Sequence, residues 1–170
     1  MEVAKKEKGN KSDIYFLVAF VMMGILFYSS SQTYEQQSQI STLHRLLQNE
    51  PFKEKLAGTV IHYAGSTISI EESGYFHFIE FFIRKGAHFF SYFIIGGSLF
   101  LGLQPRINHL LLTGVISWLA ATGYAATDEF HQMLTGGRTP LFQDVALDSV
   151  GAFTAIVICV IIWIVKRSKT

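Results

Sequence analysis

Polar residues between positions 128 and 151 are the part of this chain whose types and spacing permit chemistry. The stretch reads DEFHQMLTGGRTPLFQDVALDSVG and lies between two long apolar segments. It carries Asp128, Glu129, His131, Gln132, Arg138, Asp144 and Asp148. Charges at the edge of a membrane-length segment, or inside one, are costly and need partners. The stretch is therefore the first candidate for a site.

Three kinds of chemistry suit these residue types. Arg138 follows two glycines and suits a phosphate or a carboxylate, because guanidinium binds such groups bidentately and glycines expose backbone N–H groups. Carboxylates beside a histidine can divide acid and base roles, which makes Glu129, His88 and Asp128 the candidate catalytic residues. The third kind is a metal site built from His88, His131 and carboxylates.

The sequence argues against the metal site. DEFHQ lacks the HExxH spacing that puts two histidines and a glutamate on one zinc-binding helix. On a helix with 3.6 residues per turn, His131 points about 100° away from Asp128 and Gln132. We therefore expect no metal and no cofactor.

Composition and charge placement predict an all-α integral membrane protein. Of the 170 residues 49% are hydrophobic, and the formal net charge of +1 gives no reason to expect nucleic-acid binding. The apolar residues fall into blocks long enough to cross a bilayer. The single cysteine, Cys159, lies in such a block, so no disulfide framework is expected. Four transmembrane helices are predicted at about 14–31, 86–103, 109–127 and 145–165, in one membrane domain (14–170) after a basic tail (1–13).

The polar connection 32–74 is expected to hold amphipathic helices at the membrane surface. Leu43, Leu46 and Leu47 fall on one helical face, and Pro51 predicts a break and a restart. An apolar pattern with a period near four then continues through Phe52, Leu56, Val60 and Tyr63. One or two interfacial helices are therefore predicted in this first outer loop.

The second span has a polar stripe at its start. Lys85, His88 and Tyr92 recur at three- and four-residue steps, so a helix aligns them on one side. An overlapping set with the same spacing is His77, Glu80, Arg84, His88 and Ser91. We expect the segment 104–106, which contains Pro105, to close this helix and 133–143 to be a loop.

Lysine and arginine near the helix ends predict the orientation. Both terminal tails are basic, so both termini are assigned to the cytoplasm. Arg84 and Lys85 then lie outside, against the charge rule, and we expect carboxylate partners to hold them there. This topology gathers the start of the second span, the end of the third, the loop 133–143 and the start of the fourth at the outer face.

One structural alternative and one further functional alternative stand beside a binding or catalytic site. An internal ion-pair network that fixes helix packing is favoured for Asp148 taken alone. The whole set of polar residues favours a site, because packing needs only one or two such groups and small residues already allow close approach. A transporter is disfavoured, because the polar residues do not continue toward the cytoplasmic helix ends.

The same motifs resemble those of the VanZ-like membrane protein family. The matching pieces are RKGAHFFSY at 84–92, DEFHQ at 128–132, GGR at 136–138 and DVALDSVG at 144–151, with a Ser-Ser-Gln element after the first span. The resemblance covers nearly the whole chain in order and spacing. Two departures are Thr33, where a proline is common, and Asp148, where an asparagine is also accepted.

The resemblance implies a small bacterial cell-envelope membrane protein of a family named for resistance to the glycopeptide antibiotic teicoplanin. It implies as ligand-binding residues Lys85, His88, Tyr92, Asp128, Glu129, Gln132, Arg138, Asp144 and Asp148. The expected partner is a membrane lipid or a lipid-linked cell-wall intermediate, engaged at the outer face. The alternative is a membrane-embedded enzyme that uses acid/base or phosphoryl chemistry on a polyprenyl or phospholipid headgroup.

In the binding interpretation, Arg138 and Lys85 contact the anionic group of the ligand. Asp128, Glu129 and Asp144 orient these cations, and His88 and Tyr92 supply hydrogen bonds. In the enzymatic interpretation, Glu129 or His88 is the base.

Overall fold

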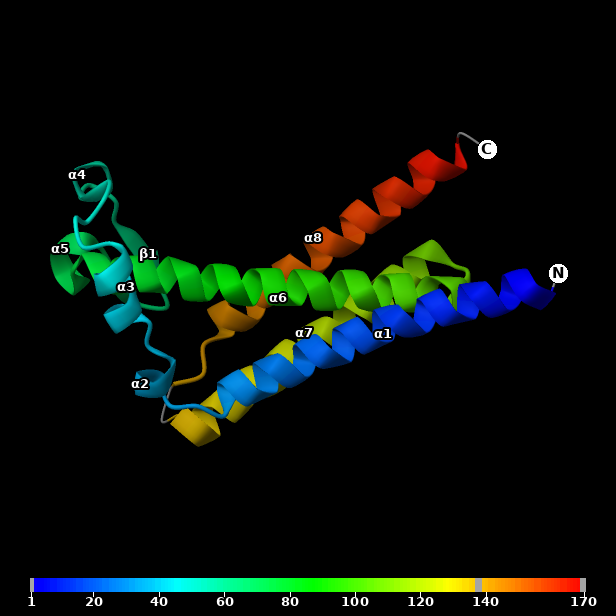
Figure 1. The fold of residues 1–170 in the computed structure, drawn as a ribbon, viewed down its shortest axis with the longest axis horizontal. Coiled ribbons are helices and arrows are strands. Elements are labelled where there is room, and N and C mark those ends of the chain that lie inside the picture. Colours follow the sequence, from blue (N-terminus) through cyan, green and yellow to red (C-terminus); the bar gives the residue numbers. More distant parts are fainter. Residues whose placement is uncertain (1, 137–138, 169–170) are drawn as a thin grey trace.

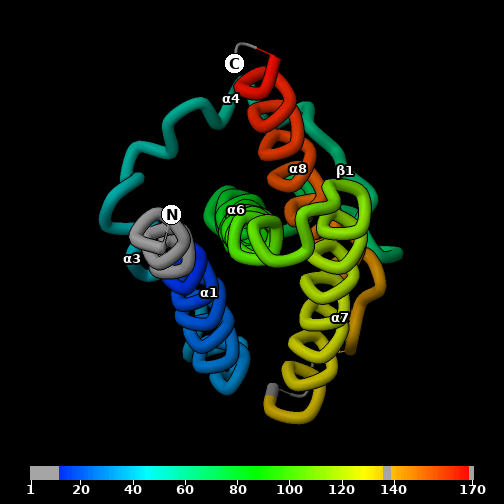
Figure 2. The backbone as a smooth tube through the Cα atoms, turned by 90° about the vertical axis from the view of Figure 1, so that its right-hand side faces the viewer, coloured from blue at the N-terminus to red at the C-terminus, as the bar shows by residue number. Residues whose placement is uncertain are grey.

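Four long helices form the protein, and the computed structural model describes residues 2–136 and 139–168. They are α1 (Glu2–Ser30), α6 (Tyr75–Ile107), α7 (Leu110–Gly136) and α8 (Phe142–Arg167). Helix α6 is central and packs against the other three (Figures 1 and 2). The chain begins and ends at one end of the bundle, and the short elements between α1 and α6 lie at the other end (Figure 1).

The prediction of an all-α membrane protein with four spans is confirmed in the described residues. Each long helix contains an apolar stretch long enough to cross a bilayer. Large apolar side chains face outward on these helices, as lipid contact requires and water contact disfavours. Examples more than half exposed are Leu17, Phe20, Leu111, Leu119, Phe153 and Ile161.

Helix α6 extends slightly past the segment 104–106 that was expected to close it. Pro105 and Arg106 lie inside α6, which ends at Ile107. The next residue, Asn108, caps the helix with a left-handed φ of 52°. Pro105 has no backbone N–H and so leaves the Leu101 carbonyl without that helical hydrogen bond, and the helix continues for only two residues beyond it. Arg106 then joins α6 to α1, since its Nη2 lies 2.5 Å from Asp13 Oδ1.

The predicted loop 133–143 is shorter than expected. Helix α7 continues to Gly136, and α8 already begins at Phe142. Arg138, one of the predicted ligand-binding residues, lies outside the described residues.

The segment 32–74 is built from short elements. The helices are α2 (Tyr34–Gln37), α3 (Ile40–Leu46), α4 (Lys53–Leu56) and α5 (Ile70–Ser73). Thr33 caps the start of α2 through a reciprocal capping box with Gln36. The short helices agree with the predicted break near Pro51, and their placement at the membrane surface stays a prediction.

The predicted helical continuation through Tyr63 is wrong. The chain forms an antiparallel hairpin of β1 (Ile61–Tyr63) and β2 (Ser66–Ile68). Ala64 and Gly65 connect the strands with φ values of 52° and 82°. Two adjacent residues with positive φ suit the right-handed twist of a tight hairpin, and a helix cannot continue through them.

Helices α6 and α8 approach each other closely at glycines. A Cβ atom at Gly151 would lie 2.4 Å from the carbonyl oxygen of Phe89, and one at Gly96 would lie 2.7 Å from Cα of Ala152. Ala155, one turn beyond Gly151, is also buried and faces Gly97. The small-residue pair of Gly151 and Ala155 therefore lies at a helix contact, as its spacing predicts.

Replacing Gly151 with alanine should destabilise the bundle. The added methyl group must push α8 away from the Phe89 backbone, and such overpacking costs about 1–3 kcal/mol. We expect a thermal unfolding midpoint several degrees lower in detergent. Gly123→Ala is the matched control, because no atom lies within 4 Å of a Cβ there. Equal midpoints for the two variants would contradict the close contact.

Candidate functional site

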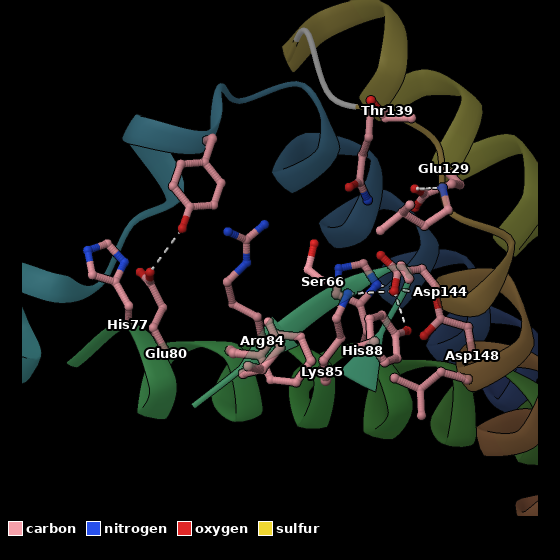
Figure 3. Close-up of a pocket in the computed structure, with 18 of the residues that line it drawn as sticks. Ser66, His77, Glu80, Arg84, Lys85, His88, Glu129, Thr139, Asp144 and Asp148 are labelled. Atoms are coloured by element: carbon pink, nitrogen blue, oxygen red, sulfur yellow. Dashed lines mark hydrogen bonds and ion pairs between the residues drawn. The ribbon is translucent and has the colours of Figure 1, made fainter. Parts of the chain in front are cut away.

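A polar cavity of about 860 Å³ opens at the loop end of the bundle. Its floor and walls come from α6, α7 and α8, and the β1–β2 hairpin and the segment near Tyr34 form its rim (Figure 3). Of the predicted site residues, those that line the cavity are Lys85, His88, Glu129, Gln132, Asp144 and Asp148.

Lys85 and Asp144 form the first ion pair across α6 and α8. Lys85 Nζ lies 2.5 Å from Asp144 Oδ1, and the Tyr63 hydroxyl donates to the same oxygen at 2.5 Å. Lys85 Nζ also lies 4.9 Å from the centre of the Tyr63 ring. Burial and this hydrogen bond raise the pKa of Tyr63 above its usual range, so the hydroxyl stays a donor. The expectation that Lys85 has a carboxylate partner is confirmed.

His88 and Asp148 form a second pair one turn deeper. His88 Nδ1 lies 3.2 Å from Asp148 Oδ2, and Asp148 is 4% exposed. The other oxygen, Oδ1, is buried without a hydrogen bond to any described residue. The spacing of 85 and 88 on α6 thus matches that of 144 and 148 on α8, as the aligned polar stripes predict.

Tyr92 and Asp128 lie behind this cavity and do not line it. Tyr92 is fully buried, its ring centre is 6.2 Å from that of Tyr124, and its hydroxyl has no hydrogen bond within the described part of the chain. Asp128 Oδ2 accepts a hydrogen bond from Gln132 Nε2 at 3.2 Å, one turn away on α7. Gln132 therefore connects the buried carboxylate to the cavity wall.

Glu129 supports the turn into α8. Its Oε1 accepts the backbone N–H of Leu141 at 2.8 Å, and Leu141 precedes α8 without a side-chain cap. Among the described residues, Glu129 forms no ion pair within 4.0 Å. A cavity-lining carboxylate without a described cation is costly to bury.

His131 faces away from the cavity. Its Nδ1 shares a hydrogen bond of 2.8 Å with Ser30 Oγ, and its ring stacks on Phe27 with centres 4.6 Å apart. This agrees with the helical geometry expected from the sequence, which points His131 about 100° away from Asp128 and Gln132. No group of three histidine, cysteine, aspartate or glutamate side chains within residues 2–136 and 139–168 is arranged to hold a metal.

Glu80 has a role that the sequence interpretation missed. It is 1% exposed and accepts hydrogen bonds from the Gln39 backbone N–H at 2.5 Å and the Ser38 hydroxyl at 3.0 Å. Gln39 precedes α3 and makes no side-chain cap, so Glu80 substitutes for one from a distant helix. The sequence placed Glu80 in a polar stripe among aromatic residues at the start of α6, but nothing in that spacing indicated a partner in the segment 32–74.

Arg84 also differs from expectation. We expected a carboxylate partner, but no ion pair joins Arg84 to a described residue. Its Nη2 instead donates to Gln37 Oε1 at 3.4 Å, and its guanidinium carbon lies 4.8 Å from the centre of the Tyr34 ring. Arg84 therefore presents a cation to the cavity, with no carboxylate of a described residue within 4.0 Å (Figure 3).

Replacing Tyr63 with phenylalanine should loosen the hairpin from the cavity rim. The variant loses a hydrogen bond to a charged acceptor, which contributes about 1.5–3 kcal/mol. We expect backbone amides of 61–68 to exchange with deuterium about tenfold faster, measured by mass spectrometry. Tyr28→Phe is the control, because Tyr28 is exposed on α1. Unchanged exchange in the hairpin would show that Asp144 does not hold it.

Comparison with known proteins gives one finding. No curated protein and no solved structure matched the sequence. The model of the VanZ/LLP1 family matched residues 15–163, a range that reaches all four apolar spans and includes every polar motif described above. The chain belongs to the VanZ/LLP1 family.

Proposed function

We propose that this protein binds the polar headgroup of a membrane lipid or of a lipid-linked cell-wall intermediate. The observation that supports the proposal is a charged cavity of about 860 Å³ at the end of an otherwise apolar, membrane-length bundle. A headgroup can enter such a cavity while its hydrocarbon tail stays beside the apolar outer faces of the helices.

The proposed orientation places the cavity at the outer face of the cell membrane and both termini in the cytoplasm. Its support is the lysine and arginine content of the two terminal tails. The resemblance to teicoplanin-resistance proteins extends the proposal to glycopeptide susceptibility, because such drugs act at the outer face on lipid-linked wall precursors.

The proposed contacts follow the charges of the cavity. Lys85 reaches the anionic part of the headgroup while Asp144 orients it, and His88 supplies a hydrogen bond. Arg138 is proposed as a second cationic contact because it follows two glycines in the GGR motif. Tyr92 and Asp128 do not line the cavity, so we propose that they support its wall and do not contact the ligand directly.

A catalytic role is the second candidate. It is favoured by one observation, that Glu129 and His88 both line the same cavity. A base and an acid on opposite walls suit proton or phosphoryl chemistry on a bound headgroup. His88→Ala separates the candidates, because an enzyme keeps its ligand and loses turnover.

Replacing Lys85 with alanine should weaken lipid binding. Loss of a charge-assisted hydrogen bond costs about 1.5–3 kcal/mol, so the affinity for the co-purified lipid should fall about tenfold or more. Native mass spectrometry of the purified protein measures the retained lipid. Lys85→Arg keeps the pair with Asp144 and should retain binding, and Lys55→Ala on exposed α4 is the surface control. Equal lipid retention in all three variants would overturn the proposed contact.

Cysteine labelling tests the proposed orientation. Thr139 is exposed beside the cavity, so Thr139→Cys in a Cys159→Ser background should react with an impermeant maleimide in intact cells. Ser168→Cys, after α8, should react only once the membrane is permeabilised. The reverse pattern would place the cavity in the cytoplasm.

A further inference from the structure

The charges that line the cavity differ in whether they are neutralised. Lys85 is paired with Asp144, and His88 is hydrogen-bonded to Asp148. Glu80 has no cation but is saturated by donors from Ser38, Gln39 and Tyr34. Each of these groups already has a partner within the protein, so a ligand can only share it with that partner.

Arg84 and Glu129 form no ion pair within 4.0 Å with any described residue. The Arg84 guanidinium has five N–H donors and gives one to Gln37, while the Tyr34 ring covers one face. Glu129 accepts the Leu141 N–H through Oε1 and has a second carboxylate oxygen. The two side chains come from α6 and α7 and line the same cavity (Figure 3).

Resting on the proposed function, we infer that the ligand is a zwitterionic headgroup, with its phosphate on Arg84 and a primary ammonium on Glu129. A purely anionic headgroup pairs with Arg84 but leaves Glu129, which lines the same cavity, without a cation. A purely cationic group satisfies Glu129 and is repelled by Arg84. A zwitterion neutralises both at once.

The phosphate assignment follows from the geometry of guanidinium. A planar fork of N–H donors binds two oxygens of one phosphate, and a half-buried position strengthens each contact. The Tyr34 ring and the Gln37 amide hold the Arg84 side chain in place without neutralising it. Arg84 is therefore preorganised for an anion.

The ammonium assignment follows from the aromatic rings. A quaternary ammonium has no N–H group and is recognised by open aromatic faces. Here the rings of Tyr63 and Phe81 face Lys85 at 4.9 and 5.6 Å, and the ring of Tyr34 faces Arg84. The rings are thus occupied, whereas Glu129 is an acceptor suited to an ammonium that carries hydrogens.

Lipid competition tests this assignment on the purified full-length protein. Phosphatidylethanolamine, phosphatidylcholine and phosphatidylglycerol with identical acyl chains are offered together, and bound lipid is counted by native mass spectrometry. We expect phosphatidylethanolamine to be preferred at least about fivefold over each of the others, and soluble phosphoethanolamine to displace it. A preference for either of the other lipids, or no displacement, overturns the inference while leaving lipid binding intact.

Two variants assign the contacts. Glu129→Gln should lower phosphatidylethanolamine binding to the level of phosphatidylcholine, and Arg84→Gln should weaken all three phospholipids by about tenfold. Glu54→Gln and Arg45→Gln, both exposed and away from the cavity, are the matched controls. Unchanged selectivity in Glu129→Gln contradicts the ammonium contact. If the unmodified protein retains no phospholipid, the inference fails, and failure of lipid-linked wall precursors to bind as well defeats the proposed function.

Discussion

Pairing of charges across the contact between α6 and α8 is the constraint on which the structure depends. Lys85 meets Asp144, and His88 meets Asp148 one turn along. Removing such groups from water costs several kcal/mol per ion unless a partner compensates. The partners reach each other because the backbones approach closely at Gly151, where a Cβ atom would meet the Phe89 carbonyl. Helix packing and the polar cluster therefore depend on the same contact.

Two carboxylates of the long helices also position the connection 32–74. Asp144 accepts the Tyr63 hydroxyl and so holds the hairpin, while Glu80 accepts the backbone of Gln39 and so fixes the start of α3. A second anchor is apolar, since Ile70, Tyr75 and Phe78 form a small core beneath α5. Side chains that line the cavity therefore also hold the segments at its rim. A change in the charge of Asp144 or Glu80 should then change the position of the rim.

The sequence predicted the features that depend on periodicity. Hydropathy located the four spans, and the spacing of 85 with 88 and of 144 with 148 predicted facing polar stripes. It failed where tertiary contacts decide the outcome. The stripe from Phe52 to Tyr63 resembled a helix, but the positive φ values at Ala64 and Gly65 turn the chain into a hairpin. The partners of Glu80 and Arg84 lie over 40 residues away in the chain, beyond the reach of local spacing.

An ion-pair network alone explains only part of this arrangement. It accounts for Lys85 and His88, whose partners also join the helices. It does not account for Arg84 or Glu129, because neither forms an ion pair with a described residue although both line the cavity. Helix packing gives no reason to keep them, since the close approach of α6 and α8 is already supplied by Gly96 and Gly151. Opposite charges kept apart at a cavity wall cost stability, and a ligand that neutralises both offsets that cost.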